Sequence, residues 1–149
     1  MPETKWYPHV TVAAVIKRDN KFLIVEEPSL GEQVFNQPAG HVEQGEALVA
    51  AVIREVLEET GFEFTPTALV GFYHFKAANG VTYLRFSFKG DLGKAVHEGP
   101  IDSAISAIHW LTKDELAAKN LRSTIVMPCI QDYLEGRALG LEHLQSFEL

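Results

Sequence analysis

The pattern of apolar and polar residues predicts two buried strands near the start of the chain. His9–Ile16 and Phe22–Glu26 are apolar runs rich in β-branched side chains, which favour strands. The polar residues 18–20 between them are typical of a turn, so we expect the two strands to pair as a hairpin. Proline and glycine recur from Pro28 to Gly40, and this stretch is expected to be a loop.

A helical period follows over Glu46–Thr60. Apolar side chains recur every three or four positions and form one stripe, which consists of Leu48, Val49, Val52, Ile53 and Val56. Gly61 comes directly afterwards, and glycine is typical of the residue that ends a helix because it adopts the left-handed conformation easily. The sequence therefore predicts a helix that buries one face and ends at Gly61.

A second hairpin is expected where Leu69–Lys76 and Val81–Lys89 flank the dipeptide Asn79-Gly80. Successive side chains of a strand point to opposite faces of the sheet. The second strand would therefore place Leu84, Phe86 and Phe88 on one face and Tyr83, Arg85 and Ser87 on the other.

The last third of the chain is expected to hold an acidic loop, a strand and two helices. The loop covers Asp91–Ser103 and the strand covers Ala104–Leu111. Thr112 and Glu115 form a capping-box pattern that begins a short helix, and another helix is expected over Ser123–Leu134. This order of elements predicts an α+β fold in which helices cover a mixed or antiparallel sheet.

Composition narrows the class of protein. Of 149 residues, 46% are hydrophobic and 22% are charged, as in a globular protein, and the length suits one domain over residues 1–149. No apolar run approaches the ~20 residues of a membrane span, and the N-terminus lacks a secretory signal pattern, so we expect a cytoplasmic location. The single cysteine, Cys129, lies among apolar residues and is expected to be a buried thiol.

The formal net charge of −7 argues against nucleic-acid and anionic-membrane partners, which this field would repel. The same field would repel a phosphorylated small molecule, unless a bound divalent cation inverted the local sign.

Three acidic residues of the predicted helix, Glu55, Glu58 and Glu59, converge on one strip of its surface. Arg54 can pair with Glu58, whereas Glu55 and Glu59 have no cationic partner in the helix. One interpretation is a solvated acidic face. Two features favour a cation site: Glu55 and Glu59 lie beside the apolar stripe, where unpaired charge is costly, and the helix dipole disfavours acids in the last turns. Carboxylate oxygens are ligands of Mg²⁺, Mn²⁺ and Ca²⁺.

Residues 40–62 resemble the Nudix box, the signature of a family of hydrolases. The signature is Gly, five residues, Glu, seven residues, then Arg-Glu-apolar-any-Glu-Glu-any-Gly-apolar. Every position is matched, by Gly40, Glu46, Arg54, Glu55, Val56, Glu58, Glu59, Gly61 and Phe62. The resemblance implies an α/β/α sandwich with a mixed β-sheet and a loop–helix–loop metal site.

The resemblance also implies roles for these residues. Glu55 and Glu59, assisted by Glu58 and the backbone carbonyl of Ala39, would hold Mg²⁺, with Mn²⁺ as an alternative. Glu55, Glu58 and Arg54 form the expected catalytic group, in which water attacks a phosphorus atom of a nucleoside diphosphate linked to another group. The residues expected to maintain the shape of the motif are Gly40, Glu46 and Gly61.

Stretches that extend beyond the box resemble a bacterial subgroup of Nudix phosphatases, the NudJ type. They are PHVTVAAV at 8–15, FNQPAGHVE at 35–43, YLRFSF at 83–88 and NLRSTIV at 120–126. This resemblance implies release of orthophosphate from small nucleoside tri- and diphosphates, or action on thiamine-related pyrophosphates. Separately, we expect a monomer or a homodimer. The alternative is a Nudix-fold module that senses a nucleotide without cutting it. The acidic composition, without basic runs, disfavours RNA decapping.

Many Nudix enzymes carry a further acid before a strand that ends in Trp, which here is Trp110. The corresponding position holds Ala104, a departure from the family pattern. Asp102 and Glu98 are the nearby substitutes for a catalytic acid, and for both a solvated loop acid is the alternative interpretation.

Four further residues are candidates for binding substrate. Arg85 would contact phosphate or form a salt bridge, since guanidinium groups suit both roles. Arg122, beside Ser123, would hold an anion or cap a helix. Asn36 and Gln37 would contact a base or phosphate, or make structural loop hydrogen bonds.

Overall fold

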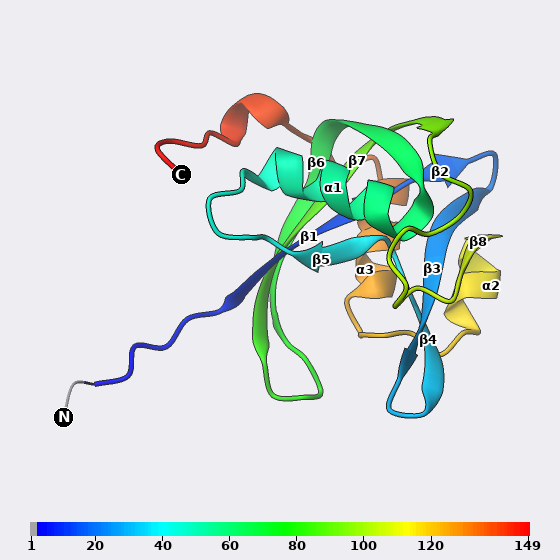
Figure 1. The fold of residues 1–149 in the computed structure, drawn as a ribbon, viewed down its shortest axis with the longest axis horizontal. Coiled ribbons are helices and arrows are strands. Elements are labelled where there is room, and N and C mark those ends of the chain that lie inside the picture. The colour runs from blue at the N-terminus through cyan, green and yellow to red at the C-terminus, as the bar shows by residue number, and fades with distance from the viewer. Residues whose placement is uncertain (1–2) are drawn as a thin grey trace.

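The computed structural model describes residues 3–149 and contains a mixed β-sheet with β1 (His9–Val15) inside it (Figure 1). β1 pairs antiparallel with β5 (Ala39–His41) and parallel with β7 (Thr82–Ala95). β7 pairs antiparallel with the long β6 (Phe62–Lys76), and β9 (Leu139–Gly140) pairs with β6. The strand order is β5-β1-β7-β6-β9.

A second sheet forms around β3 (Lys21–Ser29). β2 (Lys17–Arg18) and β4 (Glu32–Asn36) pair antiparallel with successive parts of β3. β8 (Ala107–Leu111) pairs antiparallel with its residues Phe22–Glu26. This sheet brings residues 17–36, from the first quarter of the chain, beside residues 107–111.

Helices cover both faces of the sheets. α1 (Leu48–Thr60) packs with one apolar cluster, which contains Val12, Ala14, Leu23, Val52, Val56, Leu69 and Phe88. α2 (Lys113–Ala117) and α3 (Val126–Leu134) pack with a second cluster, which contains Val15, Phe22, Ile24, Val70, Leu116, Cys129 and Ile130. Consecutive residues of one strand, such as Ala14 and Val15, belong to different clusters, because their side chains point to opposite faces of the sheet. The predicted α/β/α sandwich with a mixed sheet is confirmed, and a 3₁₀ turn (Leu141–His143) lies near the C-terminus.

The predicted pairing of the first two strands is wrong, because β1 and β3 belong to different sheets. The hairpin joins only β2 to β3, through a turn in which Asp19 has a positive φ of 55°. The four residues Val12–Val15 are all buried, so both faces of β1 are covered by core. A strand that is buried on both faces usually lies inside a sheet, with a neighbouring strand on each edge. The two neighbours of β1 are β5 and β7.

The stretch from Pro28 to Gly40, expected to be a loop, is instead largely strand. Ser29 pairs with Glu32, so Leu30 and Gly31 form a two-residue turn, with φ values of 51° and 80°. Two positive φ values match the tight hairpin turns whose twist suits β-strands. Leucine rarely adopts such a conformation, which is why the sequence did not indicate this turn.

Several other boundaries differ from the expected ones. The 62–76 strand begins directly after Gly61 rather than at Leu69, and its partner continues to Ala95, into the expected acidic loop. The strand that contains Trp110 begins at Ala107 rather than at Ala104. Asp102 Oδ1 accepts a hydrogen bond from the amide of Ala104 (2.9 Å), which keeps that segment in a turn. α1 and α3 begin at Leu48 and Val126 and are therefore slightly shorter than predicted.

Gly61 ends α1 in the left-handed conformation, with a φ of 80°, as predicted. A side chain here would also overlap the carbonyl oxygens of His97 and Gly99, so the loop after β7 passes close to the helix end. Cys129 is a fully buried thiol, as predicted, and burial raises its pKa. Within residues 3–149, no helix is long and apolar enough to cross a lipid bilayer.

Candidate active site

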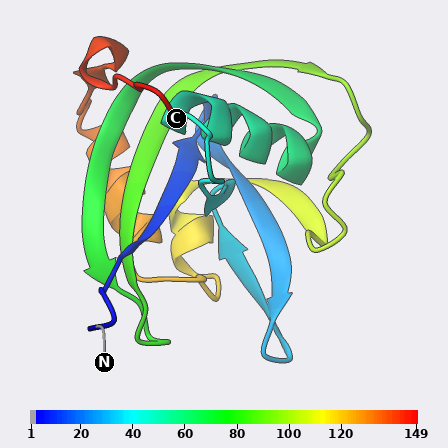
Figure 2. The ribbon, with the colours of Figure 1, turned by 60° about the vertical axis from the view of Figure 1, so that its left-hand side comes forward.

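A cavity of about 840 Å³ lies between the turns of the β3–β4 and β6–β7 hairpins, which project from the same end of the molecule (Figures 1 and 2). Most of the predicted site residues line it. They are Asn36, Ala39, Gly40, Arg54, Glu55, Glu58, Glu59, Arg85, Asp102 and Arg122. Residues far apart in the sequence therefore share one cavity, whose walls come from α1, from strands of both sheets and from the loop that precedes α3.

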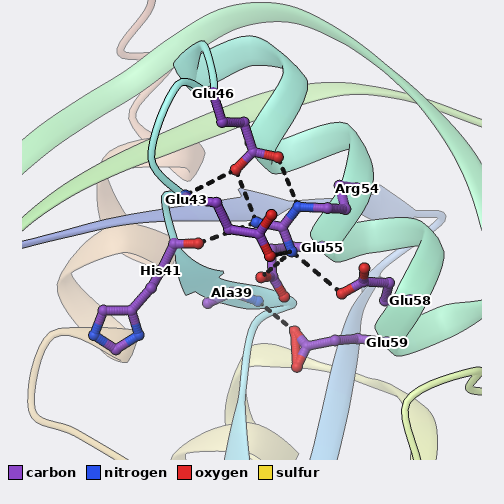
Figure 3. A network of polar contacts seen from close by, with 8 residues as sticks. All are labelled: Ala39, His41, Glu43, Glu46, Arg54, Glu55, Glu58 and Glu59. Carbon is purple, nitrogen blue, oxygen red and sulfur yellow. Dashed lines mark hydrogen bonds and ion pairs between the residues drawn. The ribbon is translucent and has the colours of Figure 1, made fainter.

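Glu59 is a buried carboxyl group on the wall formed by α1. Its Oε1 accepts a hydrogen bond from the backbone amide of Ala39 (2.6 Å), which joins β5 to the helix (Figure 3). The pKa of Glu59 is raised to about 9, mainly by burial and with smaller contributions from the nearby Glu55, Glu27 and Asp102 carboxylates, against the lowering effect of the Ala39 amide. Without a bound cation, this carboxyl group is therefore protonated at neutral pH.

Arg54 binds several acids of the box at once. Its Nε and Nη2 donate to the two carboxylate oxygens of Glu46 (2.6 and 2.9 Å), and Nη2 also donates to the carbonyl of His41 (3.1 Å) (Figure 3). Its Nη1 donates to Glu58 (3.2 Å). The hydrogen bond from Arg54 is the main reason that the pKa of Glu46 is lowered. Arg54 thus joins the loop before α1 to the helix.

Glu55 corrects one prediction, because it does have a cationic partner in the helix. Arg54 Nη1 donates to Glu55 Oε1 (2.8 Å), although adjacent helical residues do not normally face each other. The long arginine side chain makes this contact possible. Burial still raises the pKa of Glu55, while Arg54 opposes that effect.

Gly40 has a specific steric reason to lack a side chain. A Cβ atom built on it would overlap the carboxylate of Glu55. Because that carboxylate is the end of a flexible side chain, it can move aside, so the expected damage is to the site rather than to the fold.

Gly40→Ala is expected to keep its melting temperature but to bind Mg²⁺ roughly tenfold more weakly, an effect typical of misoriented metal ligands. Magnesium titration by calorimetry checks this result. Gly93→Ala, on β7 and outside the cavity lining, is the control. Wild-type magnesium affinity in Gly40→Ala would show that the contact with Glu55 has no role in the site.

Of the two acids considered as substitutes for Ala104, the structure brings only Asp102 to the cavity. The carbonyl of Glu58 accepts hydrogen bonds from the amides of both Ile101 and Asp102 (2.8 Å each), which hold this segment against α1. Glu98 is exposed and is not among the cavity-lining residues of the described chain, so its proposed catalytic role is not supported. The physical reason is that the amides of Val96 and His97 bind the carbonyl of Gly61 and carry Glu98 past the helix end.

Arg85 is buried in the cavity wall and is held by amide groups. Its Nη2 donates to Gln37 Oε1 (2.7 Å) and to Asn36 Oδ1 (3.4 Å). The salt bridge considered as its alternative role is not formed with any residue of the described chain. Gln37 is itself buried and lies behind the lining, so direct contact with substrate is not supported for this residue.

Arg122 enters the cavity from the loop before α3 and forms an ion pair with Glu27 of β3 (2.8 Å). Its amide donates to the carbonyl of Phe35 (2.9 Å), which fixes the backbone beside β4. The helix-capping alternative is not observed: Ser123 Oγ accepts a hydrogen bond from the amide of Ile125 (3.2 Å) in the turn before α3, and the N-cap residue Ile125 makes no side-chain capping bond. Sequence reasoning missed Glu27, and the only signal was a pair of acids at the end of an apolar strand.

The donors present suit a hard divalent cation. Three carboxylates of α1 line the cavity with Asp102, and oxygen ligands of this kind are preferred by Mg²⁺ and Mn²⁺. Among residues 3–149, no three acidic, histidine or cysteine side chains already converge as a metal cluster. One oxygen of each buried carboxylate is already engaged, Glu59 Oε1 by the Ala39 amide and Glu55 Oε1 by Arg54 Nη1.

The fold, the intact acidic motif and the cavity define a Nudix hydrolase. The family profile of the NUDIX domain matches residues 7–127, and the chain belongs to this family. The chain is 40% identical over 141 residues to phosphatase NudJ of Escherichia coli K12, covering 94% of this chain and 92% of that protein. It therefore has a homologue of the NudJ type, as the sequence predicted.

Solved structures agree with this placement. A NUDIX hydrolase from Nitrosomonas europaea superposes with a TM-score of 0.90 at 46% identity, covering 95% of this chain and 98% of that one. The NUDIX domain of Shewanella oneidensis NrtR, complexed with ADP ribose, has a TM-score of 0.71 at 17% identity, covering 89% of this chain and 90% of that one. The second comparison shows only the shared fold.

Proposed function

We propose that this enzyme hydrolyses phosphoanhydride bonds in small nucleoside di- and triphosphates or related pyrophosphates, with Mg²⁺, and releases orthophosphate. One observation carries the proposal: a single cavity joins the acidic strip of α1 to the guanidinium groups of Arg85 and Arg122. Acids suit the cation and arginines suit phosphate oxygens, which is the pairing that phosphoryl transfer requires. The homologous phosphatase NudJ supports the release of phosphate.

Charge in the cavity supports the need for a cation. The lining holds six carboxylates, from Glu27, Glu43, Glu55, Glu58, Glu59 and Asp102, and three guanidinium groups, from Arg54, Arg85 and Arg122. Even with Glu59 protonated, five carboxylates outnumber three guanidinium groups, so the metal-free cavity is negative and repels a phosphate chain. A bound divalent cation reverses this local repulsion.

Glu55, Glu58 and Glu59 are the residues that would hold the magnesium ion, together with the Ala39 carbonyl. When bound, the ion neutralises phosphate charge and lowers the pKa of water. Glu58 is the most exposed of the three carboxylates of α1, and Asp102 also lines the cavity. These two residues are therefore the candidates for accepting the proton of the attacking water. Arg54 holds the acids in place through the contacts described above.

Arg85 and Arg122 would bind the phosphate chain of the substrate, which positions one phosphorus atom for attack. The cavity volume of about 840 Å³ is within the usual range for small-molecule sites, which extends from roughly 300 to 1,000 Å³. A nucleotide or a pyrophosphate with a single ring system is therefore of suitable size.

Hydrolysis of a nucleoside triphosphate in ¹⁸O-labelled water tests the proposal directly. We expect turnover with Mg²⁺, none in excess EDTA, and the label in orthophosphate, because attack at the terminal phosphorus gives that product. Label in a nucleoside monophosphate, with pyrophosphate accumulating, would contradict the orthophosphate-releasing reaction but not family membership. Binding of nucleotides without any turnover would instead support the sensing module.

A further inference from the structure

The guanidinium of Arg85 is buried without a negatively charged partner in the described part of the chain. The residue is 5% exposed, and its Nε has no hydrogen-bond partner among residues 3–149. The Nη2 atom has only the amide oxygens of Gln37 and Asn36. Burial lowers the pKa of Arg85, as expected for a cation removed from water, while the nearby Cys129, Glu59 and Tyr73 oppose this effect. An arrangement of this kind costs stability unless something else interacts with the charge.

Neighbouring contacts fix the amide of Gln37 in one orientation. This side chain is 1% exposed, and its Nε2 donates to the backbone carbonyl of Val126 at the start of α3 (3.1 Å). A carbonyl can only accept, so the nitrogen of the amide must face Val126 and the oxygen must face Arg85. The position of the guanidinium in the cavity wall is therefore set by a chain of contacts that contains no charge besides its own.

The other two arginines of the cavity differ in this respect. Arg54 is paired with Glu46, Glu55 and Glu58, and Arg122 is paired with Glu27. Their charges are largely compensated by the protein. A carboxylate at position 36 would have nearly the shape of the amide and would compensate Arg85, and one at position 37 would compensate it at the cost of the hydrogen bond to Val126, yet both positions carry amides.

We propose that Asn36 and Gln37 hold Arg85 in place while leaving its charge uncompensated, so that it attracts an anionic phosphate of the substrate. This inference deepens the proposed function and rests on it. Arg85 lines the cavity and would contact the phosphate, while the buried Gln37 is a positioning residue. The ligand class is a diphosphate or longer phosphate chain, one end of which lies at the acidic strip.

Asn36→Asp is the main test, because it changes charge without changing shape. Its new carboxylate would pair with Arg85, so we expect KM for a nucleoside triphosphate to rise roughly tenfold or more, while kcat changes less than about threefold. Gln37→Glu is expected to raise KM in the same direction, but it also removes the hydrogen bond to the Val126 carbonyl, so Asn36→Asp is the variant that isolates charge. Gln33→Glu, an exposed amide-to-acid change on the same strand and outside the cavity lining, is the matched control and should keep the wild-type KM.

A binding measurement separates this inference from the proposed function. The affinity for imidodiphosphate, a pyrophosphate analogue that is not hydrolysed at its bridge, is measured with Mg²⁺ present. Asn36→Asp should weaken this binding by the same factor as it raises KM. An inactive wild-type enzyme that still binds the analogue would refute the hydrolytic function alone. A folded Asn36→Asp variant with unchanged affinity and KM would overturn the inference alone.

Arg85→Gln decides the matter if neither carboxylate variant folds. It removes the buried charge but keeps a polar side chain, so the fold should persist. We expect at least a tenfold loss of affinity for imidodiphosphate, in line with the loss of a charge-assisted contact. Unchanged affinity in this variant would show that the charge of Arg85 is not used by the anion and would overturn the inference.

Discussion

Glu59→Gln is expected to reduce kcat/KM by at least ~10³-fold, since the substrate can be neutralised and positioned only if the acidic strip holds its cation. Glu55→Gln should have a similar effect on activity. The two variants are expected to remain folded. For Glu59, glutamine has nearly the shape of the protonated carboxyl group that the metal-free protein contains, so the melting temperature in EDTA should stay the same or rise.

Steady-state kinetics and thermal melts of the same preparations check this expectation. Glu63→Gln is the control, because Glu63 is an exposed acid of β6 that lies just beyond the end of α1 and outside the cavity lining. Its activity should match the wild type. If the Glu55 and Glu59 variants unfolded in EDTA while the control did not, the acidic strip would have a structural role and not the ligand role proposed for it.

The metal-free protein is expected to lose stability as pH rises from about 4.5 toward 9, because of Glu59. The pKa of this group is raised from 4.5 to about 9 on folding, mainly by burial. Between these values the folded protein keeps a proton that the unfolded chain has released. The free energy of unfolding should therefore fall with pH, by up to ~1.4 kcal/mol per pH unit for one proton.

Glu59→Gln isolates this contribution, because it removes only the titrating group. Urea unfolding in EDTA at pH 5.5, 6.5 and 7.5 should show the variant becoming progressively more stable than the wild type. The difference should shrink when Mg²⁺ is added, because a cation stabilises the ionised carboxylate in the folded state. A difference that stayed constant over this pH range would mean that Glu59 is ionised in the folded protein as well as in the unfolded chain, and would contradict a pKa raised to about 9.

The sequence predicted elements well where one period dominates. The stripe of α1 and the alternating residues of β7 are placed as expected, with Phe88 in the core beneath α1 and Ser87 against Cys129 on the opposite face. Pairing between distant strands was not predictable in the same way. The burial of β1 on both faces is a property of the whole sheet, and the Leu30-Gly31 turn depends on a backbone conformation that leucine seldom adopts.

Within the site, the sequence predicted residues whose spacing is local and missed those joined by the fold. Glu55, Glu58 and Glu59 lie on one helix, so their convergence follows from helical geometry. The ion pair of Glu27 with Arg122 spans 95 positions, and no local pattern indicates it. The choice between Asp102 and Glu98 likewise depended on which backbone amides reach the end of α1, which only the structure shows.

The contacts of Arg54 have a consequence for how enzymes with this fold can diverge. Every partner of this arginine lies between His41 and Glu58, so the part of the protein proposed to bind the cation is held together by contacts within one short segment. The residues that would bind the parts of the substrate away from the cation come from β3, β4, β7 and the loop before α3. Substitutions in those elements can therefore change substrate preference during evolution, while the short segment around Arg54 and the chemistry proposed for it stay the same.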